Sequence, residues 1–259
     1  VPPPPPPPPT SLVLSAVAST TKRRQRSPVP APPQSSELHV LAETERWAAI
    51  DKPAGLLSVP GVGLAKADSI QQRARLRWPN ATGPITVHRL DMDTSGVILV
   101  ALDEAAQRNL SVQFQDRRTR KSYAALLHGR VDQDTGVIDL PLRPDLDRRP
   151  YQLVDFDLGK SSRTRYEVLQ RTDTISRVRF EPITGRSHQI RMHAAARKHI
   201  VHNGAPRPGG LGCPVVGDPL YGPSQQAPPA ERLMLHAERL EFNDPDTNQR
   251  ITIEAPVPF

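Results

Sequence analysis

The feature that most constrains this chain is a polar stretch, residues 88–96, that runs directly into six apolar residues, 97–102. Three of the six are β-branched, a composition that predicts a buried strand. The polar stretch must then lie at the edge of a core, where residues 94–96 (Thr-Ser-Gly) are typical of a turn. Asp91, two residues after Arg89, is either part of a structural ion pair or a catalytic carboxylate, and the residue types leave both open.

The charge of the chain is unevenly distributed. The net charge of +7 and the pI of about 10.0 favour a polyanionic partner such as nucleic acid. Residues 1–36, however, contain four Lys or Arg and no acid, which leaves only +3 for residues 37–259. Binding to nucleic acid must then depend on local clusters of arginine rather than on net charge.

Cysteine content and hydropathy exclude several classes of protein. The one cysteine, Cys213, cannot form an intramolecular disulfide and fits a reducing compartment, so we expect a cytoplasmic protein. No Cys/His grouping has zinc-finger spacing, and no apolar stretch approaches the roughly 20 residues that span a membrane. With 259 residues, the chain can form one large domain or two small ones.

Residues 1–36 are of low complexity and include a run of prolines at 2–9. Such a segment cannot bury enough apolar area to offset the entropy lost on ordering it. We therefore expect a disordered, basic, proline-rich tail followed by one folded catalytic domain at 37–259. The basic residues, the Ser/Thr content and the lack of acids also fit an organellar transit peptide, and both interpretations stay open.

Within residues 37–259 the pattern predicts strands, hairpins and short helices, an α+β fold. Asp103 is a good N-cap for a helix whose apolar residues Ala106, Leu110 and Phe114 recur every four positions. Glycine and proline punctuate 130–162 and 202–212, so we expect irregular structure in the first and a loop insertion in the second. The other expected strands are 38–42, 47–50, 122–127, 164–170, 176–182, 239–242 and 250–255, and the other expected helices are 68–78 and a short one ending near 197.

Two groups of charged or polar residues need a choice between interpretations. Residues 117–121 contain four Lys or Arg, which either close the preceding helix, where cations suit the helix dipole, or contact phosphates. His188 and His193 could be metal ligands, but five positions apart they point about 140° away from each other on a helix. We therefore expect no metal site at these histidines.

Several motifs follow one another along residues 38–259. Lys-Pro-Ala-Gly-Leu at 52–56 precedes His-Arg-Leu-Asp-Met-Asp-Thr-Ser-Gly at 88–96 and Lys-Ser-Tyr at 121–123. Gly-Arg-Ser-His-Gln-Ile-Arg-Met-His follows at 185–193, and 215–222 and 233–237 continue the series. Together these motifs resemble the RluA family of pseudouridine synthases, most closely its short, single-domain members that act on stem-loops of tRNA and large-subunit rRNA.

The resemblance implies a fold, a reaction and a partner. The family fold is a mixed, mostly antiparallel central sheet with flanking helices and one long catalytic cleft. Its members isomerise specific uridines in structured RNA to pseudouridine, and the reaction requires neither a metal nor another cofactor. We accordingly expect RNA as the partner, no cofactor, no metal, no membrane, and a monomer.

The motifs also imply roles for single residues. Asp91 would be the catalytic aspartate, which either attacks C6 of the uracil or C1′ of the ribose, or acts as a base at the sugar. Tyr123 would stack on the uracil and take the C5 proton late in the reaction, and Arg191 would pair with Asp91. The substrate-binding residues would be Arg89, Arg186, His188 and Leu235, the last packed under the uracil.

Two other functions fit parts of the same sequence. A catalytically inactive RNA-binding module could have this fold, although the intact Asp91, Tyr123 and Arg191 argue against it. A metal-dependent phosphohydrolase would use His88 and Asp91 and would lose activity on treatment with a chelator. A turnover assay and metal analysis distinguish these alternatives.

Overall fold

The computed structural model describes residues 37–61, 67–223 and 230–259. The predicted tail, 1–36, lies outside the described residues. The strands are β1 (His39–Glu43), β2 (Trp47–Lys52), β3 (Ser95–Ala101), β4 (Arg120–His128), β5 (Thr135–Asp139), β6 (Leu142–Pro144), β7 (Gln152–Val154), β8 (Arg163–Arg171), β9 (Ile175–Pro182), β10 (His199–His202), β11 (Ala205–Pro208), β12 (Leu235–Asn243) and β13 (Arg250–Glu254). The helices are α1 (Ile70–Arg77), α2 (Glu104–Gln115) and α3 (Gln189–Ala195).

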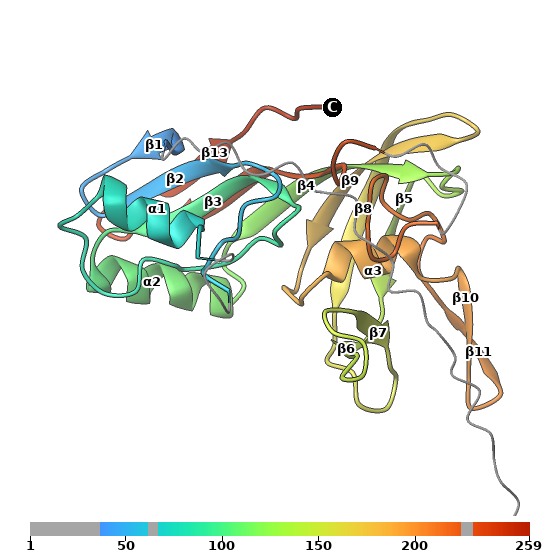
Figure 1. Ribbon diagram of the computed structural model, residues 1–259. Helices are drawn as coiled ribbons and strands as arrows, with labels where there is room; N and C mark the ends of the chain where they lie inside the picture. Colours follow the sequence, from blue (N-terminus) through green and yellow to red (C-terminus); the bar gives the residue numbers. More distant parts are fainter. Residues whose placement is uncertain (1–36, 62–66, 224–229) are drawn as a thin grey trace, which may run out of the picture.

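A nine-stranded sheet in the order β1-β2-β3-β12-β4-β9-β8-β5, with β13 paired to β12, runs through the whole molecule. β3 and β12 are parallel, and every other neighbouring pair in this sheet is antiparallel. The expected mixed, mostly antiparallel sheet is thus confirmed. In Figure 1, α1 and α2 lie beside the half that holds β1, β2 and β3, and α3 lies beside the half that holds β8 and β9.

The first half of the sheet is buried on both faces. Trp47, Val97 and Leu99 pack with Leu110 of α2 on one face, whereas Ile50 and Ile98 belong to the cluster that includes α1 on the other. All seven residues of β3 are buried, which confirms the predicted buried strand. Because alternate side chains of a strand point to opposite faces, a continuous apolar run fits a strand covered on both sides.

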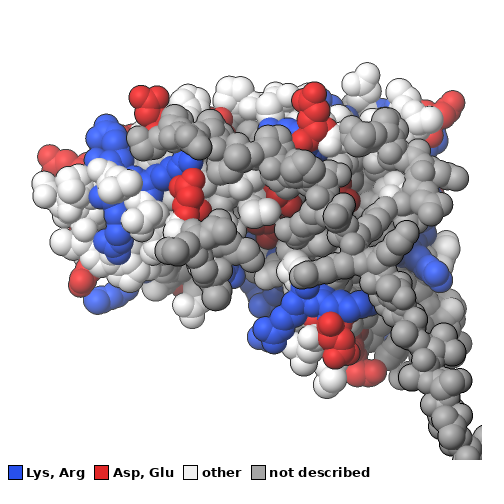
Figure 2. All heavy atoms as spheres, in the orientation of Figure 1, with Lys and Arg blue, Asp and Glu red and all other residues white. Residues whose placement is uncertain are grey.

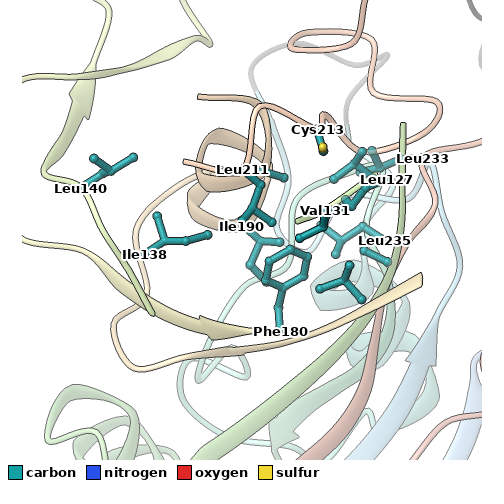
Figure 3. Close-up of a cluster of buried hydrophobic side chains, with 14 residues drawn as sticks. Leu127, Val131, Ile138, Leu140, Phe180, Ile190, Leu211, Cys213, Leu233 and Leu235 are labelled. Carbon is teal, nitrogen blue, oxygen red and sulfur yellow. The ribbon is translucent and has the colours of Figure 1, made fainter. Parts of the chain in front are cut away.

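The second half of the sheet is buried on one face. Val178 and Phe180 of β9 are fully buried and pack in the cluster around Ile190 of α3, shown in Figure 3. Between them in sequence, Arg179 instead forms ion pairs with Glu167 and Glu238. This alternation is the two-residue period expected of a half-covered strand.

The N-caps of the two longer helices, of which only Asp103 was predicted, are visible in the hydrogen bonds. The Asp103 side chain accepts from the backbone N–H of Ala106 at the start of α2, as expected. The Ser69 hydroxyl plays the same role for α1 by accepting from the N–H of Gln72. No helix within the described ranges is long and apolar enough to cross a membrane.

Three expectations about local structure were wrong or incomplete. The cations at 117–121 do not close α2, because this helix ends at Gln115 and residues 120 and 121 already belong to β4. The segment 202–212 is no simple loop, since β10 and β11 form a hairpin across Asn203 and Gly204. Residues 130–162 contain the short strands β5, β6 and β7 where irregular structure was expected.

Candidate active site

A cleft of about 1160 Å3 lies where the two halves of the sheet meet. All seven residues singled out from the sequence line it, although they come from four separate segments: Arg89, Asp91, Tyr123, Arg186, His188, Arg191 and Leu235. Tyr123 packs against the buried clusters of both halves, so its ring marks the junction between them. The structure therefore brings the predicted residues together.

Hydrogen bonds from the Lys-Pro-Ala-Gly-Leu segment and from Ser58 fix the loop that carries Asp91. The Lys52 ammonium is fully buried and donates to the carbonyls of Pro53, Leu56 and Met92 at 2.9, 2.7 and 2.9 Å. Ser58 extends this support, because its hydroxyl donates to the carbonyl of Leu90 at 2.7 Å and accepts from the Leu90 N–H at 3.0 Å. Burial lowers the pKa of Lys52 to about 7, although the nearby carboxylates of Asp93 and Asp91 act in the opposite direction.

Gly96 explains how the loop passes into β3. Its φ is +107°, and an added Cβ would lie 2.2 Å from the carbonyl oxygen of Ala237 on the neighbouring strand β12. A side chain at this position would therefore push apart the parallel pair β3–β12 next to the cleft. Gly96, which ends the polar motif, is thus required because the backbones of β3 and β12 approach each other closely at this position.

Asp91 faces the cleft with 29% of its side chain exposed. One of its oxygens, Oδ2, lies 3.6 Å from an Arg191 guanidinium nitrogen and 4.0 Å from Nε2 of His188. These contacts are longer than hydrogen bonds, so the carboxylate keeps its acceptor capacity for another partner. Asp91 is thus accessible and close to a cation, as a nucleophile or base in a closed cleft must be.

Arg191 pairs with Asp91 more weakly than expected, because Asp218 binds the guanidinium instead. Nε and Nη2 of Arg191 donate to the two carboxylate oxygens of Asp218 at 2.8 and 2.6 Å, and 2% and 0% of the two side chains are exposed. The backbone N–H groups of Leu220 and Tyr221 donate to the same Asp218 carboxylate. Burial opposes the charged form of Arg191, but the ion pair with Asp218 and the charge of Asp91 raise its pKa further above its usual value.

Asp218 is one residue of the site that the sequence argument missed. A signal was present, because Asp218 belongs to the motif at 215–222 and a buried arginine needs a fixed counter-charge. The sequence alone did not indicate that the partner of Arg191 lies 27 positions further along the chain.

His188 is connected to a second missed residue, Tyr221. The His188 Nδ1 and the Tyr221 hydroxyl are 2.8 Å apart, and the same hydroxyl accepts from the N–H of Gln152 at 2.8 Å. The Arg191 guanidinium lies over the Tyr221 ring, 5.4 Å from its centroid. Burial lowers the pKa of His188, while Asp91 acts against this shift. His188 is therefore a neutral, oriented ring at neutral pH.

Tyr123 is a poor base in this environment. Burial and the negative charge of Asp91 both raise the pKa of its phenol well above the usual value. The hydroxyl is therefore protonated at neutral pH, and it can accept a proton only after its surroundings change during the reaction. Its ring, in contrast, is already placed to pack against a base in the cleft.

The cleft is basic although the folded chain as a whole is not. Six Lys or Arg are among the described residues that line it, together with one carboxylate, that of Asp91; the six are Arg89, Arg117, Lys121, Arg149, Arg186 and Arg191. Two of them come from the cluster at 117–121, whose alternative interpretation was phosphate contact. On the face shown in Figure 2, by comparison, the coloured basic and acidic side chains are interspersed.

Two further histidines of the motifs, His88 and His193, have structural contacts. His88 Nε2 accepts from the N–H of Leu99 at 2.9 Å, and its ring stacks on Phe114. His193 bonds to Ser162 and Thr164 at 3.0 and 2.9 Å. Burial lowers the pKa of His88 to about 3 and that of His193 to about 4. Among the residues described, no three or more His, Cys, Asp or Glu are grouped so as to hold a metal ion.

Comparison with known proteins agrees with this geometry. The family described as RNA pseudouridylate synthase matches residues 46–196, more than half of the chain and the part that holds Asp91, Tyr123 and Arg191. The chain belongs to the RNA pseudouridylate synthase family. It is therefore an RNA pseudouridine synthase, an isomerase, as the motifs implied.

Individual relatives support the same assignment of this pseudouridine synthase. It is 41% identical to the dual-specificity RNA pseudouridine synthase RluA of Escherichia coli K12 over 229 residues, 88% of this chain and 97% of that protein. With the protein of the same name from Yersinia pestis it shares 43% identity over 208 residues, 80% of this chain and 93% of that protein. Among solved structures, human RNA pseudouridylate synthase domain containing 1 is 28% identical with a TM-score of 0.67, covering 88% of this chain and 87% of that chain.

Proposed function

We propose that this pseudouridine synthase isomerises uridines in stem-loops of tRNA and rRNA. The observation that carries the proposal is one accessible carboxylate, Asp91, in a cleft lined by six cations. Cations along the cleft suit the phosphates of a bound nucleic acid. The relatives above are named dual-specificity enzymes, which supports more than one class of RNA substrate.

In the proposed reaction, Asp91 acts on a uridine that has left its base stack. The C1′–N1 bond breaks, the uracil turns, and a C1′–C5 bond forms; C5 loses its proton and N1 gains one. Asp91 either forms a temporary bond to C6 or C1′ or removes a proton from the sugar. Each route requires an ionised carboxylate, and Arg191, 3.6 Å from one oxygen of Asp91, places a cation beside it without occupying both oxygens.

The walls of the cleft hold the base and its neighbours. Tyr123 and Leu235 provide flat and aliphatic surface for the uracil, and Arg89 and Arg186 are placed for phosphates. A uridine in a loop is the preferred target, because flipping costs least where a base is already poorly stacked. We propose further that the enzyme acts as a monomer in the cytoplasm.

Tritium release from C5-labelled uridine tests this proposal directly. A labelled stem-loop should release tritium, whereas a fully paired duplex with the same uridine should release much less. Affinity should fall with salt by about 0.7 log units per log unit of salt for each phosphate neutralised on a single strand. RNA binding without release would identify a catalytically inactive module, and equal release from loop and duplex would contradict the preference for loops.

A further inference from the structure

A second cavity, of about 600 Å3, adjoins the cleft. It lies between β7, α3 and β10, and Tyr151 and Gln152 line both cavities. We call it the Tyr151 groove. In Figure 1, the two hairpins that flank it, β6–β7 and β10–β11, project together next to α3. A chain that leaves the cleft past Tyr151 therefore enters this groove without leaving the protein surface.

The lining of the Tyr151 groove suits an anionic ligand. Met192 of α3 and Ile200 of β10 contribute aliphatic surface, while Arg148, Arg197 and His199 contribute basic groups. No carboxylate is among the described residues that line the groove. Arg148 forms an ion pair with Asp145, but three quarters of its side chain are exposed.

Aromatic rings in the same place give a second reason to expect a nucleic acid. Tyr151 and Tyr221 meet edge to face with centroids 5.7 Å apart, and the Arg148 guanidinium lies 5.9 Å from the Tyr151 centroid. An aromatic face next to arginine is the combination that binds single-stranded bases and their phosphates. An acidic peptide would satisfy the charges but would make no special use of the ring.

We propose that the Tyr151 groove binds nucleotides that flank the target uridine in the same RNA molecule. This inference rests on the proposed function, because the ligand of the groove is the continuation of the ligand of the cleft. The groove adds affinity, with one base stacked on Tyr151 and phosphates close to Arg197. Tyr221 connects the two sites, since it lines the groove and its hydroxyl bonds His188 in the cleft.

The test compares two RNAs and four variants. One RNA is a stem-loop with long flanks, and the other keeps the loop but lacks the flanking nucleotides. Tyr151→Ala and Arg197→Gln should each weaken binding of the long RNA, the first by roughly five- to a hundredfold because one stacked base is lost. Arg108→Gln is the matched control, because Arg108 is exposed on α2 and lines neither cavity.

Binding of the short RNA should be unchanged in Arg197→Gln, because Arg197 lines only the groove. In Tyr151→Ala it should fall less than binding of the long RNA, because Tyr151 lines the cleft as well as the groove. Tyr151→Phe should bind the long RNA like the wild type, since the ring remains. Arg197→Gln should also lower the salt slope by about 0.7, whereas Arg108→Gln should not. Circular dichroism and a denaturant midpoint equal to the wild type exclude misfolding as the cause of weaker binding.

Two results would overturn the groove assignment. Wild-type affinity of Tyr151→Ala for the long RNA would show that the groove does not bind RNA. Equal losses on both RNAs would show that Tyr151 acts within the cleft alone. Failure of the proposed function has a different signature, because the wild type would then release no tritium from either RNA while the binding measurements still decide what the groove does.

Discussion

Two loops place a carboxylate next to the same arginine, and they use it in opposite ways. In the loop after Gly217, the side chain of Asp218 is completely buried. Its carboxylate accepts hydrogen bonds from Nε and Nη2 of Arg191 and from two backbone N–H groups. The loop after Leu90 leaves Asp91 29% exposed, with Arg191 at 3.6 Å. The oxygens of Asp218 are committed to the protein, whereas those of Asp91 remain available to a substrate.

This difference shows how one buried cation can serve both structure and chemistry. A guanidinium is planar and stays charged, so it can be fixed on one edge by a bidentate pair while another edge faces a second carboxylate. Fixing Arg191 through Asp218 holds its charge in place without blocking Asp91. If Arg191 bound Asp91 through both nitrogens instead, the oxygens of Asp91 would be occupied and could not act on a substrate.

The largest expected effect comes from Asp91→Asn, which removes the charge but keeps the shape. We expect folded protein that binds RNA and forms pseudouridine at least roughly a thousandfold more slowly, because no nucleophile or base remains. Asp91→Glu should also fail, since the reaction tolerates displacement of only about 1 Å. Single-turnover tritium release is the measurement. Asp93→Asn, in the same loop, is the control, and release by Asp91→Asn within about tenfold of the wild type would contradict the assignment.

Arg191→Lys should have the next largest effect, about a hundredfold loss of the single-turnover rate. Lysine keeps a positive charge but has no fork, so it cannot contact Asp218 with two bonds and still face Asp91. Stability to denaturant should fall as well, because Asp218 loses part of its pairing. An enzyme with full activity would show that a point charge is sufficient and that the fork geometry is irrelevant.

Tyr123→Phe tests a second residue of the cleft beside Asp91. We expect RNA affinity close to that of the wild type, because the ring still stacks, and product formation reduced about a hundredfold, because the proton at C5 has lost its acceptor. Tyr166→Phe on β8 is a control that removes a half-buried hydroxyl outside the cleft. Undiminished product formation would leave Tyr123 with a stacking role alone.

Asp218→Asn should affect stability more than catalysis. Asparagine still accepts from the backbone N–H groups of Leu220 and Tyr221, but Arg191 loses its buried counter-charge, which costs about 3–5 kcal/mol in unfolding free energy. The rate should fall only about tenfold, because Asp91 itself is unchanged. Asp145→Asn, whose partner Arg148 is mostly exposed, should lower the unfolding free energy much less. If urea unfolding showed similar losses of unfolding free energy for Asp218→Asn and Asp145→Asn, the structural role assigned to the buried Asp218 would be wrong.

Removal of residues 1–36 should have the smallest effect and sets the baseline for the others. Their composition has no apolar face to dock and matches none of the motifs. A protein that begins at Glu37 should therefore fold and turn over at the wild-type rate on a stem-loop. Loss of folding, seen by circular dichroism, would mean that this segment packs on the domain.

Local patterns were sufficient to predict much of the fold. The apolar run at 97–102 became the fully buried β3, Asp103 became an N-cap, and the strand expected at 176–182 became β9. These predictions succeeded because strand period and helix capping depend on neighbours in the sequence. The seven site residues came instead from the resemblance to a family, and the structure places them along one cleft.

Long-range partners were decided by the tertiary structure. β12 lies between β3 and β4 although it comes last but one in the chain, and this pairing creates the need for Gly96. The true partner of Arg191 is Asp218, and His188 depends on Tyr221, which comes 33 positions later. The sequence is compatible with many pairings of these charged residues, because the position of a charged residue in the chain does not indicate which residue it will contact. Packing selects one pairing, since a buried charge is stable only beside the partner that the folded backbone brings within hydrogen-bond distance.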